Sequence, residues 1–386
     1  MTKVLMKGNE ALAEAAIRAG CRSYFGYPIT PQSEVPEYFA RKLPDVGGVF
    51  LQAESEIASI YMLYGAAAAG HRTMTSSSGP GISLMQEGIS SAAGSDLPMV
   101  IVNMMRGGPG LGSIQPSQTD YFQTTRGGGN GDYRVLAYAP SNVQELVDYT
   151  MLAFEKADEW RMPAFIMSDG MLGQMMEPVE FSESNKEVLN RQAKEWTTDG
   201  RRDERGHRNV ITSLELSTPE LEKINRKRYE KYQQVMEKEV IFEEDGVKDC
   251  ELLITAYGSA ARIVKTAIQI LRENGYKVGL IRPISVWPFP YEAYKDVPCD
   301  DILVVELNNG QMLDDVKIAT EGRQNIHFYN RLGGMVPTAQ EIVDKAIEIL
   351  GGKNDWSKRK SGLWKINRFD RCASTFLSGL YSWYCT

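Results

Sequence analysis

The chain has 386 residues and a net charge of −7. This length exceeds that of a typical single domain, so we expect two domains. A hydrophobic content of 42% and a charged content of 24% are ordinary for a soluble globular protein, and the acidic balance gives no reason to expect a nucleic-acid partner. We also expect a cytoplasmic protein with no membrane contact, because the sequence shows no signal peptide and no apolar run of transmembrane length.

The cysteines and histidines are dispersed. No CxxC pair occurs, and the ligand spacing of a zinc or iron–sulfur site is absent. We therefore expect no metal bound by this chain itself. The residues concerned are Cys21, Cys250, Cys299, Cys372, Cys385, His71, His207 and His327.

Residues 1–181 alternate between helix and strand patterns. Asn9 is a candidate cap for the first helix, and Thr30 or Ser33 for the second. With Ser33 as the cap, Pro36 falls in the first turn, where its missing N–H does no harm. Strands are expected at 23–26, 49–52, 72–75, 99–105 and 164–168, and helices at 56–69 and, after the capping-box pattern SNVQ at 141–144, to about 159. Strands separated by helices predict an α/β fold with a doubly wound parallel sheet.

The rest of the chain divides into three parts. Residues 182–249 are highly charged, with one candidate helix at 219–238, and are interpreted as a linker over a surface or, alternatively, a lid. Residues 250–351 show a second strand–helix pattern. Residues 352–386 form a basic and aromatic tail, for which we prefer docking against a partner subunit over binding a nucleic acid or a membrane surface. Strands are expected at 252–257, 278–283, 302–307 and 326–329, and helices at 260–274 and 338–350.

Three loops follow strands of the first part, at the sheet edge where open α/β sheets bind ligands. Residues 26–34 (GYPITPQSE) follow the first strand, and residues 51–59 (LQAESEIAS) carry Glu54 and Glu56 into a helix. Residues 76–81 (SSSGPG) also open a helix. Glycines there allow close backbone approach to a ligand, and helix-start N–H groups suit an anion or a polar ring edge.

Arg106 is the charge at the end of the apolar strand 99–105. Its guanidinium could bind a carboxylate in bidentate fashion, or it could pair with a local acid or cap backbone carbonyls. The glycine-rich region 107–132 follows, and loops of this length inside a domain are usually functional. Residues that could line either the site or a subunit interface are Gln115, Ser117, Gln118 and Asp120.

Together these motifs resemble the pyrimidine-binding domain of thiamine-diphosphate enzymes, in the branch formed by 2-oxoacid:ferredoxin oxidoreductases. Residues 250–351 resemble the C-terminal domain of the transketolase group, which is joined to the pyrimidine domain in these oxidoreductases. Around 106–132 the resemblance is particularly to alpha-type subunits acting on branched-chain 2-oxoacids such as 3-methyl-2-oxobutanoate (2-ketoisovalerate). The resemblance implies the corresponding two-domain α/β fold.

The resemblance also implies roles for individual residues. Glu56 would hydrogen-bond the aminopyrimidine ring of thiamine diphosphate and so activate the cofactor, with Glu54 as the neighbour that could be confused with it. Thr30 and Arg106 would contact the substrate, Arg106 through its carboxylate. The cofactor pocket would also include Tyr27, Pro28, Ile29, Ser78 and Gly79. The ordinary alternatives are a solvated first-turn glutamate, a helix cap and core packing.

The chain lacks the GDG-and-Asn pattern that holds magnesium and the diphosphate in this cofactor family. The resemblance therefore implies a shared cofactor, with the diphosphate and Mg²⁺ on a beta-type subunit. It further implies a gamma-type subunit, a ferredoxin-like subunit with [4Fe-4S] clusters, CoA as co-substrate and an external ferredoxin as acceptor. The reaction would convert a 2-oxoacid and CoA into acyl-CoA, CO₂ and reduced ferredoxin. A non-catalytic assembly subunit and a non-oxidative transketolase-like enzyme remain the alternatives.

Overall fold

The computed structural model describes residues 3–182 and 194–351. Residues Met1–Ala346 form one compact unit, and residues Ile347–Thr386 form a second, of which only 347–351 are described. The tail predicted at 352–386 lies outside the described residues. The division at 181, 249 and 351 stays a prediction.

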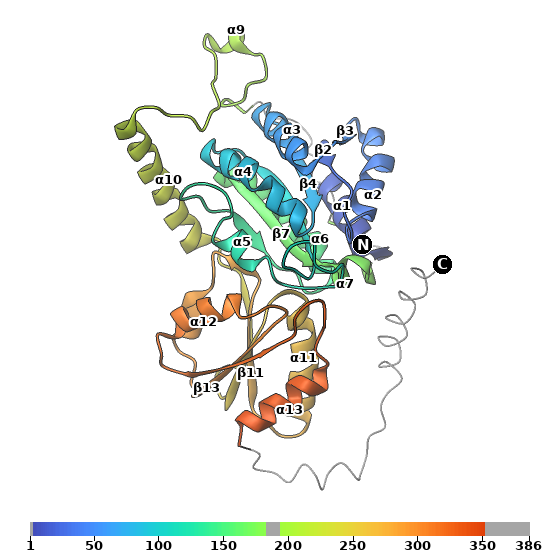
Figure 1. Cartoon of the computed structure of the whole chain (residues 1–386), viewed down its shortest axis with the longest axis vertical. Coiled ribbons are helices and arrows are strands. Elements are labelled where there is room, and N and C mark those ends of the chain that lie inside the picture. Colours follow the sequence, from blue (N-terminus) through green and yellow to red (C-terminus); the bar gives the residue numbers. More distant parts are fainter. Residues whose placement is uncertain (1–2, 183–193, 352–386) are drawn as a thin grey trace. The chain divides into compact units, whose positions relative to one another are not determined.

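A seven-stranded sheet forms the first half of the compact unit (Figure 1). Its strand order is β12-β6-β7-β5-β4-β2-β3, and all neighbours are parallel except β12, which runs antiparallel to β6. The doubly wound parallel sheet is thereby confirmed. The strands are β2 (Ser23–Gly26), β3 (Val49–Gln52), β4 (Thr73–Ser77), β5 (Met99–Met105), β6 (Leu136–Tyr138), β7 (Pro163–Asp169) and β12 (Ser285–Trp287).

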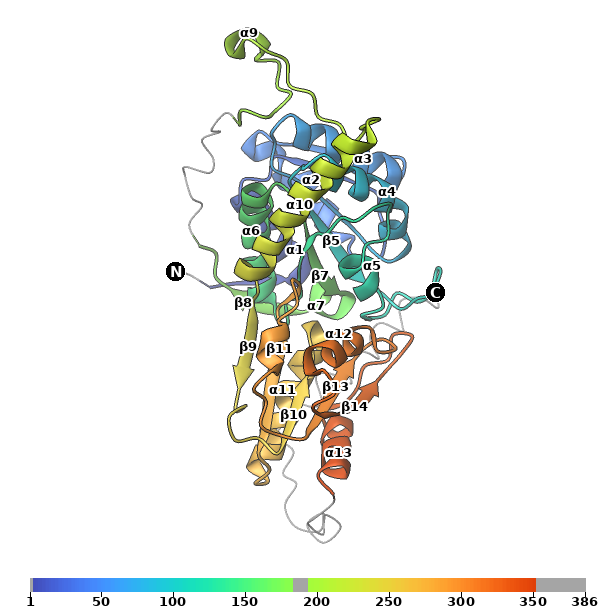
Figure 2. The ribbon, with the colours of Figure 1, turned by 90° about the vertical axis from the view of Figure 1, so that its left-hand side faces the viewer.

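Helices cover both faces of this sheet (Figures 1 and 2). Helices α1, α2 and α6 pack together on one face, and α3 and α4 on the other. The last two approach closely, since a Cβ at Gly88 would lie 2.5 Å from Ile60. The helices are α1 (Gly8–Arg18), α2 (Glu34–Lys42), α3 (Glu56–Ala68), α4 (Pro80–Gly94) and α6 (Val143–Trp160), with the short α5 (Tyr121–Thr125) and α7 (Gly170–Gln174) at the sheet edge.

A five-stranded sheet forms the second half, in the order β14-β13-β10-β11-β9. Strands β10, β11, β13 and β14 are parallel, and β9 is antiparallel to β11. The elements are β9 (Phe242–Asp245), β10 (Leu252–Thr255), β11 (Val278–Pro283), β13 (Asp301–Glu306), β14 (Asn325–Asn330), α11 (Gly258–Glu273), α12 (Gln311–Thr320), α13 (Ala339–Ile349) and the 3-10 turn η2 (Tyr291–Tyr294). Outside both sheets lie the antiparallel pair β1 (Val4–Lys7) and β8 (Met176–Val179), η1 (Pro44–Val46), α9 (Arg202–Arg205) and α10 (Thr218–Lys238).

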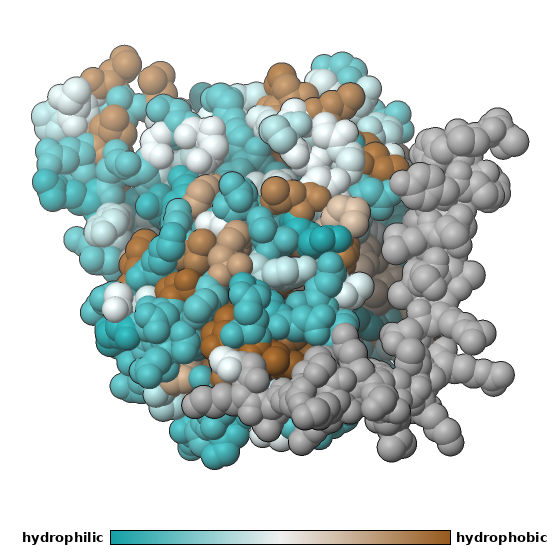
Figure 3. Space-filling view, turned by 60° about the horizontal axis from the view of Figure 1, so that its bottom comes forward, coloured by the Kyte–Doolittle hydropathy of each residue, from teal (hydrophilic) through white to brown (hydrophobic). Residues whose placement is uncertain are grey.

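The core lies between the sheets and their helices. Every residue of β5 and β7 is buried, as expected for central strands of a sheet covered on both faces. Figure 3 shows one face of the surface, where hydrophilic residues predominate and hydrophobic ones emerge between them. Among the described residues, no helix is both long enough and apolar enough to cross a bilayer.

Helix α6 corrects one sequence prediction by a single residue. Its cap is Asn142, whose side chain accepts a hydrogen bond from the Glu145 amide at 2.8 Å. The predicted capping box began at Ser141 and closed at Gln144. In the structure the reciprocal group is Glu145, which accepts from the Ser141 amide at 2.8 Å. The local polar pattern therefore located the helix start, but it misassigned the capping pair.

A buried ion cluster joins α6 to the second sheet. The fully buried Arg282 of β11 donates from Nη1 to Glu145 of α6 at 2.9 Å and to Glu243 of β9 at 2.8 Å. Burial raises the pKa of Glu145, but the hydrogen bonds and charge of Arg282 lower it by more, so the net shift is downward. Removing Glu145 from this cluster would leave the buried guanidinium of Arg282 with Glu243 as its remaining carboxylate partner.

This cluster predicts a loss of stability in acid. A carboxyl whose pKa is depressed by folding stabilises the protein above its unfolded pKa, and that contribution disappears as the pH falls through the folded value. We expect Glu145→Gln to flatten the decline in unfolding free energy below about pH 4.3, the ordinary value for glutamate. We also expect it to cost about 1.5–3 kcal/mol at pH 7, because charge-assisted hydrogen bonds are lost while Glu243 stays paired with Arg282. Denaturant unfolding at a series of pH values would measure both. Parallel pH curves for the variant and the wild type would contradict the prediction.

Candidate active site

The predicted loops meet at the carboxyl ends of β2, β3, β4 and β5. The chain leaves β2 towards its neighbour β3 on one side, and leaves β4 towards β5 on the other. The loops after β2 and β4 therefore diverge at a topological switch point, where open α/β sheets form their ligand crevice. The position of the site follows from strand order.

Glu56 is the first residue of α3, whose N-cap Ser55 accepts a hydrogen bond from the Ala58 amide at 3.2 Å. The side chain of Glu56 is buried, with 6% of its surface exposed, whereas Glu54 is exposed. No hydrogen bond links the Glu56 carboxylate to any of the described residues. The Glu56 oxygens are not among the fully buried atoms that lack a partner, so the carboxylate keeps both oxygens available to a ligand that donates hydrogen bonds.

The start of α4 lies against this carboxylate. A Cβ at Gly81 would lie 2.7 Å from Glu56 Oε1 and would overlap Ser77 Oγ. Gly81 thus permits a close approach of α4 to both groups, and a larger residue would displace them. Neither Ser77 nor Gly81 was singled out from the sequence as an individual site residue. The signal available was a polar run at the end of a buried strand.

Hydroxyl groups without partners gather at the end of β4. Thr75 Oγ1, Ser77 Oγ and Ser78 Oγ are buried and make no hydrogen bond with the described residues. Gly79 follows with a φ of +37°, a conformation that favours glycine, and forms the N-cap of α4. These free hydroxyls and the close backbone provide polar contacts for a ligand lying beside Glu56.

Arg106 follows β5, and its side chain is buried. It donates from Nη1 to the Thr30 carbonyl at 3.0 Å and from Nη2 to the Leu111 carbonyl at 3.1 Å, while Nε has no partner among the described residues. Its Cγ lies 3.5 Å from the position of a Cβ on Gly79. The carbonyl-capping alternative is therefore present, but it uses only two of the five guanidinium N–H groups.

The turn after β2 carries Thr30. Of the two candidate caps for α2, Ser33 is the N-cap residue, as one prediction had it, although its side chain makes no cap hydrogen bond. Thr30 is not the cap, because it lies in the preceding turn. The Thr30 hydroxyl is therefore not used as a cap, and the residue is exposed. Tyr27 and Pro28 are also exposed and Ile29 is partly buried, so ordinary core packing does not explain these residues.

Buried polar side chains hold the turn after β2 in place through hydrogen bonds. Asn9 lies within α1 and is not its N-cap. Its side chain instead donates to the Pro31 carbonyl at 3.0 Å and to Glu34 at 2.8 Å. Gln32 accepts a hydrogen bond from Ser76, whose hydroxyl lies 2.7 Å from that of Tyr24. The Asn9 cap prediction failed because this contact depends on a residue 22 positions away in the sequence.

Gln118 anchors the loop after Arg106 to the second half of the chain. Its Nε2 donates to the Tyr257 carbonyl at 2.8 Å, and its Oε1 accepts from the Leu307 amide at 2.9 Å. Ser117 donates to the Leu307 carbonyl at 3.1 Å. Both side chains are buried, and their contacts fix the position of the loop relative to Tyr257 and Leu307. Asp120 accepts from Asn103 at 2.9 Å, and burial raises its pKa.

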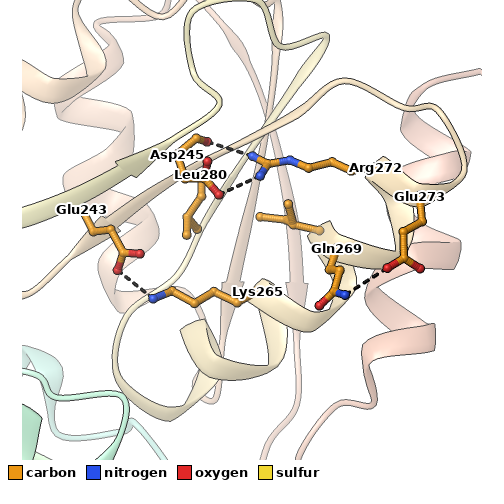
Figure 4. Close-up of a pocket in the computed structure, with 8 residues that line it drawn as sticks. Glu243, Asp245, Lys265, Gln269, Arg272, Glu273 and Leu280 are labelled. Atoms are coloured by element: carbon orange, nitrogen blue, oxygen red, sulfur yellow. Dashed lines mark hydrogen bonds and ion pairs between the residues drawn. The ribbon is translucent and has the colours of Figure 1, made fainter. Parts of the chain in front are cut away.

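A concavity lies between α11 and β9, far along the chain from these loops (Figure 4). Its charged groups are paired across the hollow: Lys265 with Glu243 at 2.8 Å, and Arg272 with Asp245 at 2.7 Å. Paired surface charges leave little for a ligand to recognise. We therefore place the functional site at the carboxyl edge of the seven-stranded sheet. Among the described residues, no group of three potential metal-binding side chains gathers.

Two family models cover most of the chain. The pyruvate flavodoxin/ferredoxin oxidoreductase, thiamine-diphosphate-binding family matches residues 14–244, and the pyruvate:ferredoxin oxidoreductase core domain II family matches residues 250–342. The chain belongs to the 2-oxoacid:ferredoxin oxidoreductase family. Membership makes it a subunit of an oxidoreductase that uses thiamine diphosphate, as the sequence motifs predicted.

Individual relatives agree with this assignment. The ketoisovalerate oxidoreductase subunit VorB of Methanothermobacter marburgensis is 48% identical over 92% of this chain and 100% of its own. The 2-oxoglutarate synthase subunit KorA of Methanocaldococcus jannaschii is 37% identical over 87% of this chain and 97% of its own. The resemblance to the ketoisovalerate branch is thereby confirmed.

Solved structures support the fold. The 2-oxoglutarate:ferredoxin oxidoreductase from Magnetococcus marinus, solved with 2-oxoglutarate, coenzyme A and succinyl-CoA bound, is 28% identical, with a TM-score of 0.82 over 90% of this chain and 65% of that chain. A split-gene transketolase at 13% identity, with a TM-score of 0.54 over 90% of this chain and 99% of that chain, shows a likeness of fold alone.

Proposed function

We propose that this chain is the catalytic, pyrimidine-side subunit of an enzyme that decarboxylates a branched-chain 2-oxoacid. The products would be acyl-CoA, CO₂ and two electrons, which pass to ferredoxin. The observation that carries the proposal is the Glu56 side chain, which is 6% exposed, accepts no hydrogen bond from the described residues and faces Ser77 and Gly81 at the switch point of the sheet.

The residues present fit the aminopyrimidine part of thiamine diphosphate. Glu56 would accept a hydrogen bond from the ring edge, and the Ser77 and Ser78 hydroxyls, which lack partners among the described residues, would provide further polar contacts. Gly79 would allow close backbone approach, and Tyr27, Pro28 and Ile29 would form the exposed wall of the pocket. When bound, thiamine diphosphate supplies the electron sink that allows the bond between C1 and C2 of a 2-oxoacid to break. Glu56 would hold the proton that this activation requires.

Arg106 and Thr30 would position the substrate. Three guanidinium N–H groups remain after the two carbonyl contacts, enough to bind a carboxylate through two parallel hydrogen bonds. Thr30 lies next to this guanidinium, because its backbone carbonyl accepts a hydrogen bond from Arg106. Orientation of the carboxylate and the neighbouring carbonyl would thus depend on one connected pair of residues.

The remaining parts of the reaction are assigned to partner chains. A beta-type subunit would hold the diphosphate and Mg²⁺, and gamma-type and ferredoxin-like subunits, the latter with [4Fe-4S] clusters, would complete the enzyme. The relatives are named as subunits, and the Magnetococcus enzyme was solved with coenzyme A, which supports these assignments. External ferredoxin would accept the electrons, in the cytoplasm.

The substrate proposal follows from the relatives. The ketoisovalerate oxidoreductase subunit is 48% identical and the 2-oxoglutarate synthase subunit is 37% identical. This ranking favours 3-methyl-2-oxobutanoate over 2-oxoglutarate. Since an apolar pocket discriminates by only about 1–3 kcal/mol per methylene, activity with related branched or short 2-oxoacids is expected.

The test uses the complex purified with its natural partners under anaerobic conditions. Ferredoxin reduction is measured with CoA and, in turn, 3-methyl-2-oxobutanoate, pyruvate, 2-oxoglutarate and an aryl pyruvate. We expect kcat/KM to be highest for 3-methyl-2-oxobutanoate, about 10-fold above pyruvate. A higher value for 2-oxoglutarate would overturn the substrate assignment. Decarboxylation without ferredoxin reduction, in a complex that lacks iron–sulfur absorption, would indicate the non-oxidative alternative.

A further inference from the structure

Two cysteines distant in sequence meet at the amino ends of adjacent strands. Cys250 and Cys299 are 49 residues apart, yet their Sγ atoms lie 3.5 Å apart. Leu253 of β10 pairs with Ile302 of β13. Cys250 and Cys299 lie the same number of residues before these two paired residues. The parallel register therefore brings the two thiols side by side.

We propose that Cys250 and Cys299 form an oxidisable dithiol, which a hydroperoxide converts into a disulfide joining β10 to β13. Neighbouring parallel strands are about 4.8 Å apart, and disulfide-linked residues have Cα atoms about 4.4–6.8 Å apart. The observed separation of the sulfurs leaves only a small side-chain movement before the bond can form. This site lies at the end of the sheet opposite to Leu307, and the inference does not depend on the proposed function.

The surroundings distinguish this pair from the other described cysteine. Cys250 and Cys299 keep exposed fractions of 7% and 6%, whereas Cys21 has none. The hydrogen bond between the two thiols lowers the pKa of Cys250, and the same bond, together with burial, raises the pKa of Cys299. Burial raises the pKa of Cys21 to about 12. Because the thiolate is the reactive form, Cys250 is the attacking sulfur, and Cys21 is inert.

The chemistry balances with the hydroperoxide as the only oxidant. The Cys250 thiolate attacks the terminal peroxide oxygen and the O–O bond breaks, giving a sulfenic acid on Cys250. The other oxygen leaves after protonation, as water from hydrogen peroxide or as an alcohol from an organic hydroperoxide. Cys299 then attacks this sulfur, so that the S–S bond forms as the S–O bond breaks and water leaves. The two thiols together lose two electrons and two protons.

The bond would reinforce the strands that hold the glycine-rich loop. β10 leads to Tyr257 and β13 leads to Leu307, the two residues that bind the Gln118 side chain. Oxidation would therefore join β10 and β13 covalently near their amino ends, whereas the glycine-rich loop is bound near their carboxyl ends. A closed loop of this length restricts the unfolded chain and stabilises the folded one.

The experiment treats the reduced full-length chain with one equivalent of hydrogen peroxide and then blocks free thiols with N-ethylmaleimide. Peptide mass spectrometry should find the peptides containing Cys250 and Cys299 linked, with a mass about 2 Da below their sum, as loss of two hydrogens requires. Cys21 should be labelled only after unfolding. The unfolding temperature should rise by several degrees on oxidation and return with dithiothreitol.

Matched variants complete the test. Cys250→Ser and Cys299→Ser should each abolish the linked peptide and the temperature shift, whereas Cys21→Ser should retain both. Linkage of either cysteine to Cys372 or Cys385, or oxidation of Cys250 to a sulfinic acid while Cys299 stays free, would overturn the proposal. So would an absence of linkage in the intact wild-type chain, a result that does not depend on whether any variant folds.

Discussion

Replacing Glu56 with glutamine is expected to lower the turnover of the assembled enzyme by at least about 100-fold, because a positioned acid–base group contributes 10²–10⁴. Glutamine keeps the size of the side chain, so the close packing against Gly81 and Ser77 is preserved. What changes is the ability to hold a proton beside the cofactor ring. The measurement is the initial rate of ferredoxin reduction with saturating 3-methyl-2-oxobutanoate and CoA.

Glu54→Gln is the matched control, because it removes a carboxylate two residues away on an exposed side chain. It should leave the rate within about twofold of the wild type, in keeping with the small effects of surface changes. Assembly with the partner subunits should be unchanged in both variants, as checked by size-exclusion chromatography. If Glu56→Gln retains nearly full activity while Glu54→Gln does not, the roles of the two residues are reversed. If both are active, the chain is an assembly subunit.

Replacing Arg106 with glutamine is expected to lower kcat/KM for the 2-oxoacid by about 10–150-fold, mainly through a higher KM, because a hydrogen bond to a charged group contributes about 1.5–3 kcal/mol. Arg106→Lys should restore only part of this loss, since an ammonium group cannot form the two parallel hydrogen bonds of a guanidinium. Steady-state kinetics over a range of 2-oxoacid concentrations would separate KM from kcat.

Arg22 provides a close control. Like Arg106 it donates to two backbone carbonyls, those of Ile17 at 3.0 Å and Cys21 at 2.8 Å, but it precedes β2 and so lies at the amino end of the sheet. Arg22→Gln should change stability without changing KM. Equal effects of the two substitutions on KM would mean that Arg106 serves only to cap the Thr30 and Leu111 carbonyls.

The sequence predicted the elements that have a strong local signal. Strands β2, β3, β5 and β11 have the predicted boundaries, because apolar runs bounded by glycine, proline or polar residues define them. Strands β1, β6, β8, β9 and β12 were missed. Each is three or four residues long and pairs with an antiparallel partner distant in the sequence: β1 with β8, β6 with β12, and β9 with β11. No local pattern encodes such a pairing.

The candidate site was predictable to a similar extent. The motif positions predicted that Glu56 and Arg106 lie at the same edge of the sheet, and the structure places both there as buried residues. The sequence could not show that Gly81 lies against Glu56, because this contact depends on the packing of α4 beside α3. Nor could it assign Gln118, which was expected at the ligand or at a subunit interface and instead joins the two halves of the chain.

That attachment limits how the polypeptide can be divided. A fragment ending before Glu251 would keep Glu56, Thr30 and Arg106, yet would lack the Tyr257 carbonyl and Leu307 amide that Gln118 requires. Its glycine-rich segment would be released, and the Leu111 carbonyl beside Arg106 would move with it. Recombinant expression of the first half alone would thus yield a polypeptide with every candidate side chain but without an organised substrate pocket. Co-expressing the missing half as a separate polypeptide is the remedy that the structure suggests.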